Sequence, residues 1–242
     1  MPISVVYDTT CVSATGKCCA WTVPAGVTSV TFEIWGGGGG GANGLMICNC
    51  CARTQSGGGG GYSLKTIPVT PGSVYTVCAG NAGVDATCNA YGAAANFCCN
   101  GVTGGTSFVT GNGLTGFCAT GGVGGCGTFE ISCYGHCGCN GAPGGRGYGG
   151  DINESGTPGV KGMAGGSNAY ASYTMGGTAG GPGGGVGGFN TGSCNAGASN
   201  SNPALHGTVP GGGGAGHGCA VDCSCFQYGS GRGAPGFVKI TW

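Results

Sequence analysis

Alternating hydrophobic and polar residues predict a β-strand near the N-terminus. Within 22–35, the apolar residues Val30, Phe32 and Ile34 alternate with the residues between them. A period of two is typical of a strand with one buried and one exposed face. This stretch is therefore the first candidate for a sheet core.

Two further stretches have strand-like patterns. Residues 62–77 hold two short runs on either side of Thr70-Pro71-Gly72, a turn sequence in which proline presets φ and glycine relaxes the next position. The last six residues, 237–242, alternate again. Because a terminal strand needs a neighbour, we expect it to pair with one of the N-terminal strands.

Glycine tracts separate these strand-like runs and add a second pattern. They occupy 36–41, 57–61 and most of 101–236. Between 141 and 183 glycine recurs in one frame of three residues, with Asn153 at a skipped position. The glycines in this frame are Gly141, Gly144, Gly147, Gly150, Gly156, Gly159, Gly162, Gly165, Gly177, Gly180 and Gly183.

A period of three matches the polyproline II helix, which has three residues per turn. Glycine at every third residue leaves one edge bare, so neighbouring helices can approach and hydrogen-bond through their backbones. Collagen uses the same edge, but the 10 prolines are too few for a collagen triple helix. The pattern predicts a bundle of short polyglycine helices, in which buried backbone groups find partners on adjacent helices.

These patterns define the expected fold class. Glycine costs about 1 kcal/mol relative to alanine at an interior helix position, so almost no α-helix is expected. We predict an all-β, helix-poor protein: a small, sandwich-like antiparallel β base joined to a polyglycine II helix bundle and stapled by disulfides. The expected parts are an N-terminal β-rich part, 1–83, completed by the strand 236–242, and a glycine-rich region of helices and loops, 84–235.

Composition and charge narrow the function. Glycine accounts for 64 of 242 residues, charged residues for only 6%, and the formal net charge is zero. Nucleic-acid binding needs clustered lysine and arginine, so nucleic acid is not an expected partner. A hydrophobic fraction of 40% with no net charge is unlike a disordered chain. No apolar stretch approaches the 18 residues of a membrane span, so membrane insertion is not expected.

Nineteen cysteines are unusual for a chain of this size. We favour the hypothesis that most cysteines form disulfides, because a glycine bundle buries few side chains and each crosslink contributes about 2–4 kcal/mol to stability. A zinc site and free buried thiols are the alternatives, and we assign no metal and no cofactor. One pattern, C-x3-C-x-C, occurs twice, and three cysteine pairs are adjacent in sequence. The disulfide candidates are Cys18, Cys19, Cys48, Cys50, Cys51, Cys98, Cys99, Cys133, Cys137, Cys139, Cys219, Cys223 and Cys225.

The order of these segments resembles a known family. A strand running from Trp21 to Trp35 leads into a hexaglycine; the stretches 57–62 and 69–77 follow, and the chain closes on 236–242. This order is similar to the glycine-rich domains of bacteriophage tail-fibre proteins and related virion surface proteins. The resemblance implies a packed polyglycine bundle whose exposed loops contact a host surface.

Aromatic residues between the glycine tracts are the receptor-binding candidates. Tyrosine with small polar neighbours suits adaptable binding loops, because it gives contact area at low entropic cost; alternatively, these rings cap the bundle. The candidates are Tyr91, Phe97, Tyr134, Tyr170, Tyr173, Phe189, Phe226 and Tyr228. No nucleophile elbow and no phosphate loop are present, so we do not expect an enzyme and assign no catalytic residue.

The leading hypothesis is a virion surface structural protein. We expect a tail-fibre or tail-tip adhesin that presents loops to a host glycan or outer-membrane protein and assembles with other virion subunits. We expect no signal peptide in residues 1–8, which have no basic start and no long apolar run; release of a virion into an oxidising medium would reconcile that expectation with the cysteines. The alternatives are a capsid decoration or fibre protein without a receptor, an ice-binding protein, and an animal glycine-rich ectodomain.

Overall fold

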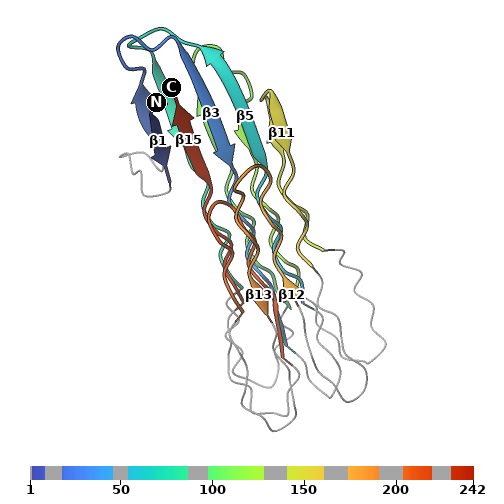
Figure 1. Cartoon of the computed structure of the whole chain (residues 1–242). Coiled ribbons are helices and arrows are strands. Elements are labelled where there is room, and N and C mark those ends of the chain that lie inside the picture. Colours follow the sequence, from blue (N-terminus) through green and yellow to red (C-terminus); the bar gives the residue numbers. More distant parts are fainter. Residues whose placement is uncertain are drawn as a thin grey trace.

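A computed structural model describes residues 2–8, 18–45, 54–86, 98–127, 141–160, 174–190, 204–219 and 230–242. The molecule is elongated, with two facing sheets at one end and a bundle of extended, glycine-rich segments running away from them (Figure 1). Both termini lie at the sheet end, where Ile3 and Trp242 exchange two backbone hydrogen bonds of 3.0 Å. The described residues contain strands and no helix, in agreement with the all-β prediction.

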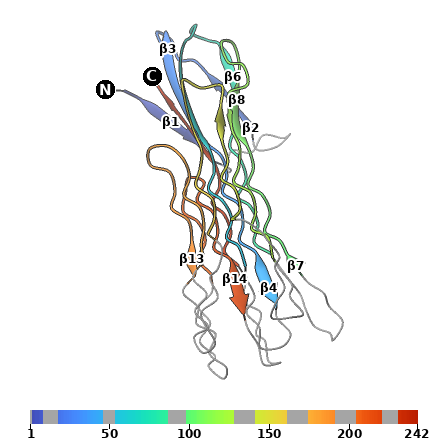
Figure 2. The same ribbon diagram turned by 90° about the vertical axis from the view of Figure 1, so that its right-hand side faces the viewer.

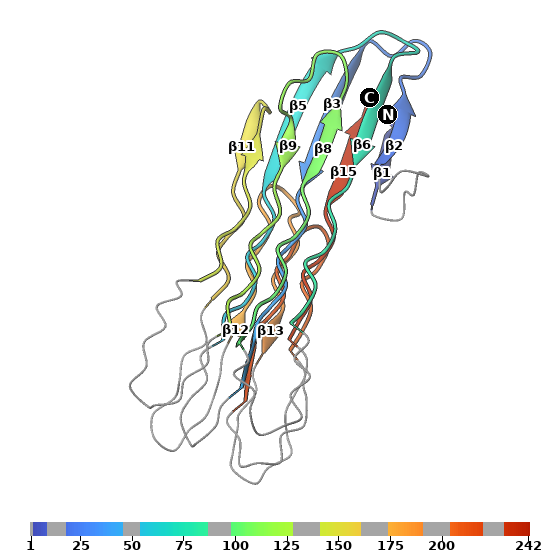
Figure 3. The ribbon, with the colours of Figure 1, turned by 180° about the vertical axis from the view of Figure 1, so that it is seen from behind.

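Two five-stranded antiparallel sheets form the base. In spatial order, the first sheet contains β1 (Ser4–Tyr7), β15 (Phe237–Thr241), β3 (Ser29–Trp35), β5 (Tyr62–Pro68) and β11 (Ile152–Glu154). The second contains β10 (Gly147–Tyr148), β9 (Cys118–Ala119), β8 (Ser107–Thr110), β6 (Val74–Cys78) and β2 (Cys18–Thr22). In Figure 3, the second sheet lies in front of the first and faces it.

The core fills the space between these two sheets. Val30, Phe32 and Ile34 of β3 are fully buried, so the predicted alternation of this strand is confirmed. Val238 and Ile240 of β15 are buried beside them. The terminal strand pairs with β3 on one side and β1 on the other, which confirms that it needed an N-terminal neighbour. The facing sheet and the residues beside its strands supply Trp21, Val23, Tyr75, Val77, Val109, Phe117 and Ala119, and β5 adds Ile67.

The turn predicted between the two strand-like runs is present, but it connects strands of two different sheets rather than two paired strands of one hairpin. β5 ends at Pro68 in the first sheet, and β6 begins at Val74 in the second. Gly72 has a φ of +84°, a left-handed conformation in which glycine carries no Cβ penalty. The Ser73 N–H donates to the Thr70 carbonyl at 3.0 Å and closes the turn.

A disulfide joins two strands of the second sheet. Cys18 of β2 is bonded to Cys78 of β6, directly across the antiparallel ladder. The neighbouring residue Cys19 is also disulfide-bonded. Two of the predicted disulfide candidates therefore take part in disulfides, whereas Cys78 was not among the candidates. Cys118 of β9 carries a free thiol, and its burial raises the pKa of that thiol.

A second apolar cluster lies where the base meets the glycine segments. Trp35 and Tyr62 contact each other there with ring centroids 4.9 Å apart. The Tyr62 hydroxyl donates to Glu33 at 3.1 Å, and Lys239 donates to the other carboxylate oxygen of Glu33 at 2.9 Å. Burial, reinforced by Glu33, raises the pKa of Tyr62 well above its usual range. The junction therefore combines a small apolar cluster with two polar contacts, from Tyr62 and Lys239, to the carboxylate of Glu33.

The glycine segments beyond the junction, here called the stem, are held by backbone hydrogen bonds between segments. Successive residues of 36–41 donate to three different neighbours, and the same neighbour recurs every third residue. Gly36 and Gly39 donate to 58–61, Gly37 and Gly40 to 102–105, and Gly38 and Gly41 to 231–234, at 2.8–2.9 Å. The carbonyls of 36–41 accept from three further segments, 83–86, 122–125 and 214. Six neighbours thus surround one central segment.

Glycine is required in these central segments because the backbones lie too close for a side chain. A Cβ on Gly38 would overlap the Gly212 carbonyl, and one on Gly39 would overlap the Val123 carbonyl. The same is true of Gly58 against the Pro143 carbonyl. The large exposed side chains of the stem, such as Val84, Val102 and Val123, lie on the segments around this centre.

The stem ends opposite the base in two short sheets. One pairs β12 (Thr174–Met175) with β13 (Phe189–Asn190), and the other has the order β14 (His217–Cys219), β4 (Asn43–Leu45) and β7 (Cys98–Cys99). Figure 2 shows β4, β7, β13 and β14 at the end farthest from β1 and β3. We call this the distal end.

The glycine frame of three does not run unbroken from 141 to 183. Gly141 and Gly144 pack against the stem backbone, but Gly147 lies in β10, and 149–151 form the turn into β11. Four strands of the base, β8 to β11, therefore lie within 107–154, a stretch that the sequence pattern placed in the glycine-rich region. Their short length, two to four residues each, left no detectable alternation.

Candidate functional site

The structure places one of the predicted receptor-binding aromatics. Phe189 lies in β13 at the distal end, with its side chain 53% exposed. The other aromatic candidates lie outside the described residues: Tyr91, Phe97, Tyr134, Tyr170, Tyr173, Phe226 and Tyr228. The candidate site is therefore built around Phe189 and the surface next to it.

Phe189 belongs to a row of exposed apolar side chains on four neighbouring segments. Val160, Met175, Phe189 and Leu205 are each between 43% and 53% exposed. Backbone bonds connect the segments in this order: Val160 N–H donates to Met175, Met175 pairs with Phe189, and Leu205 N–H donates to Phe189. These residues form a row of four large exposed apolar side chains at one level of the stem, rather than isolated exposed positions. We call it the apolar row.

A threonine-rich level lies next to the apolar row on the side of the base. The Thr157 hydroxyl accepts from the Thr178 N–H at 2.7 Å, and the Thr208 hydroxyl accepts from the Val186 N–H at 2.7 Å. These hydroxyls bond to the backbone of the adjacent segment, so they fix the spacing of the peripheral segments. The apolar row is therefore presented on a rigid support.

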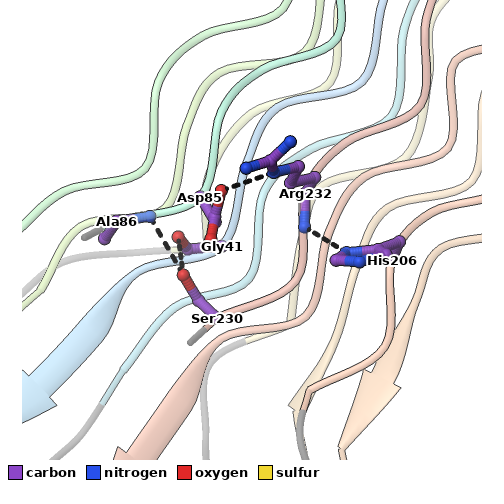
Figure 4. Close-up of polar contacts among 6 residues, drawn as sticks. All are labelled: Gly41, Asp85, Ala86, His206, Ser230 and Arg232. Carbon is purple, nitrogen blue, oxygen red and sulfur yellow. Dashed lines mark hydrogen bonds and ion pairs between the residues drawn. The ribbon is translucent and has the colours of Figure 1, made fainter. Parts of the chain in front are cut away.

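A polar cluster lies on the adjoining face of the stem (Figure 4). Arg232 Nε donates to Asp85 Oδ1 at 2.7 Å, and the Arg232 backbone N–H donates to His206 Nδ1 at 2.8 Å. Behind the pair, buried Ser230 donates to the Gly41 carbonyl and accepts from the Ala86 N–H. Three segments distant in sequence are thus joined at one level. We call Asp85, His206 and Arg232 the charged cluster.

Sequence reasoning missed the charged cluster and most of the apolar row. It assigned no functional role to Asp85, His206 or Arg232. The signal was present in a weak form, because Arg232 is one of only 7 basic residues and stands between two glycines. Which segment faces which is set by the packing of the stem, and that packing is not visible in the local sequence.

Several predicted disulfide candidates also reach the distal end. Cys98 and Cys99 form β7, and Cys219 ends β14, with β4 between these two strands. The remaining candidates lie outside the described residues: Cys48, Cys50, Cys51, Cys133, Cys137, Cys139, Cys223 and Cys225. Within the described ranges, no group of three histidine, cysteine or acidic side chains could hold a metal ion. No helix there is long and apolar enough to cross a bilayer.

Comparison with known protein families agrees with this architecture. The family model of a glycine-rich domain matches residues 12–242, which is nearly the whole chain. The protein belongs to this family. A comparison with curated proteins finds no match.

Proposed function

We propose that the protein is a virion surface component, a tail-fibre or tail-tip adhesin that presents its distal end to a receptor on the host cell. The observation that supports this is the difference between the two ends of the molecule. After residue 45, each described range begins at the distal end, and each that precedes another described range also ends there. The residues between these ranges are 46–53, 87–97, 128–140, 161–173, 191–203 and 220–229.

The stem in this proposal is a polyglycine II helix bundle. Three residues per turn explain why residues of 36–41 return to the same neighbour every third position. The same repeat holds in 56–61, where Ser56 and Gly59 donate to one segment, and Gly57 and Gly60 to another. Such a bundle satisfies its backbone groups internally and supports the distal end at a fixed distance from the base.

The receptor contact in this proposal includes the apolar row. Phe189 and Met175 offer an aromatic ring and a flexible thioether side by side, a combination that adapts to varied surfaces. The sequence-predicted Tyr170 and Tyr173 belong to the stretch between Val160 and Thr174, whose ends flank this row. The receptor is a cell-surface glycan or an outer-membrane protein.

The base is the side of the molecule that we propose assembles with other virion subunits. Strand β1 is the last strand of its sheet, and its outer edge has no strand partner among the described residues. Its sequence, SVVY, has no charge, whereas edge strands that avoid association carry lysine, proline or bulges. This edge also supports a second candidate, a decoration or fibre protein that assembles without binding a receptor.

Binding of the purified protein to whole host cells tests the adhesin proposal. We expect saturable binding that Phe189→Ala weakens. Tyr148→Ala is the matched control, because Tyr148 is an aromatic residue with similar exposure in β10 of the base. The paired change Tyr170→Ala and Tyr173→Ala tests the adjoining stretch.

The outcomes separate the two candidates. Weaker binding for Phe189→Ala with unchanged binding for Tyr148→Ala supports attachment through the distal end. Equal loss in both variants, or no binding to any host cell, contradicts the adhesin proposal. Assembly of the protein into particles without cell binding would then favour the decoration or fibre role.

A further inference from the structure

The charged cluster presents hydrogen-bond donors to solvent. Arg232 uses Nε for Asp85, and its two terminal nitrogens have no partner among the described residues. His206 accepts the Arg232 N–H at Nδ1, so the proton of the neutral ring is on Nε2, and that atom is a donor as well.

The ion pair is oriented so that its positive end faces outward. The Arg232 side chain is 61% exposed, whereas that of Asp85 is only 14% exposed. The carboxylate therefore lies beneath the guanidinium and holds it in place without covering its outer edge. A planar group with free N–H donors matches a carboxylate, sulfate or phosphate group.

The backbone around Arg232 is also fixed. Gly231 donates to Ala215 at 2.8 Å, Gly233 donates to Gly83 at 3.0 Å, and the Arg232 carbonyl accepts from Gly207 at 2.9 Å. A guanidinium on a clamped backbone loses little conformational freedom when it binds, which favours affinity at an exposed site.

Exposed apolar residues precede two members of the cluster in the sequence. Val84, next to Asp85, and Leu205, next to His206, are both about half-exposed. Carbohydrates present C–H faces as well as polar groups, so apolar side chains beside a cationic group suit a sugar that carries an acidic substituent.

We infer that the charged cluster binds an acidic polysaccharide. Arg232 takes the anionic group through its terminal nitrogens, Nη1 and Nη2, and His206 Nε2 donates to a neighbouring oxygen. Asp85 is a positioning residue that orients the guanidinium. The inference names the chemistry of the receptor and rests on the proposed attachment function.

The test compares the intact protein and its variants on immobilised dextrans of equal length. Dextran sulfate, carboxymethyl-dextran and phosphorylated dextran carry the three acidic groups, and unmodified dextran is the neutral reference. Arg232→Gln should weaken binding to the preferred acidic dextran by about 10-fold, and Arg232→Lys by less. Arg146→Gln is the matched control, since Arg146 is an exposed arginine whose segment bonds to 120–123 and 156–159 rather than to the segments around Arg232.

Binding that prefers one acidic dextran, and that the Arg232 changes weaken while Arg146→Gln does not, supports the site and identifies the acidic group. Equal loss in Arg232→Gln and Arg146→Gln shows non-specific attraction and overturns the inference, as does equal binding to neutral dextran or none to any dextran. Asp85→Asn should retain the fold, measured by thermal unfolding, and weaken binding by misorienting Arg232; unchanged binding in this variant overturns the positioning role.

The cell-binding assay separates this inference from the attachment proposal. If Arg232→Gln binds cells as well as the unmodified protein while Phe189→Ala does not, attachment stands and the polysaccharide site is wrong. If the dextran result holds but no host cell is bound, the polysaccharide site stands and attachment is wrong.

Discussion

A single methyl group in the centre of the stem should destabilise the protein measurably. Gly39 lies in a segment surrounded by six neighbours, and a Cβ at this position would overlap the carbonyl oxygens of Val123 and Gly122. Both obstacles are backbone atoms, so no side chain can rotate out of the way. Gly39→Ala therefore requires the segments to separate.

The cost follows from the hydrogen bonds that separation breaks. Gly39 donates to Gly58, Gly214 donates to Gly39, and Gly58 donates to Val123, each at 2.9 Å. At about 1 kcal/mol for each bond, the loss is about 3 kcal/mol. Alanine restricts the unfolded chain and returns about 0.4–1 kcal/mol, which leaves a net loss of about 2–3 kcal/mol.

Thermal unfolding followed by circular dichroism and tryptophan fluorescence measures this effect. For a chain of this size, a loss of this magnitude lowers Tm by about 4–12 °C. Gly180→Ala is the matched control, because a Cβ there would lie 3.1 Å from the Ser155 carbonyl oxygen, which a small shift relieves; we expect a change in Tm below about 2 °C. Equal Tm values for Gly39→Ala and Gly180→Ala would refute the packing argument.

Two further predictions concern the base. Burial and Glu33 raise the pKa of Tyr62 above the unfolded value of about 10, so the stability that the protonated tyrosine contributes is complete below about pH 10 and is lost as the pH rises. In denaturant titrations, the unfolding free energy of Tyr62→Phe should fall less steeply above pH 10 than that of the unmodified protein. An identical slope would contradict this. Cys78→Ser removes the disulfide to Cys18, which spans a sequence separation of 60, and should lower the unfolding free energy by about 4 kcal/mol. The control Cys118→Ser should lower the unfolding free energy by less than about 1 kcal/mol. Comparable losses in the two variants would show that the disulfide does not stabilise the fold.

The parts of the fold that follow from local periodicity were predictable. Val30, Phe32 and Ile34 alternate in sequence, and all three are buried on one face of β3. The terminal strand was also predictable, because Val238 and Ile240 repeat the same pattern. In both cases the chemical signal lies within a few consecutive residues.

The parts that depend on segments meeting at a distance were not predictable. Cys78 lies opposite Cys18 only because β2 and β6 pair across 60 residues. Asp85 and Arg232 are brought together because their segments flank the same central segment of the stem. Glycine carries no side chain to mark its partner, so a bundle held by backbone bonds leaves no trace of its packing order in the sequence.

The way in which the stem ends gives the molecule a modular architecture. Backbone bonds join described residues on either side of several of the stretches between described ranges: Ala42 donates to Gln55 across 46–53, Val160 to Met175 across 161–173, and Leu205 to Phe189 across 191–203. Changing the length of such a stretch costs little, because each doubling adds only about 0.6 kcal/mol of closure entropy. In the proposed adhesin, mutation and recombination would vary what the distal end binds while the glycine scaffold stays constant, as framework and variable loops do in antibodies.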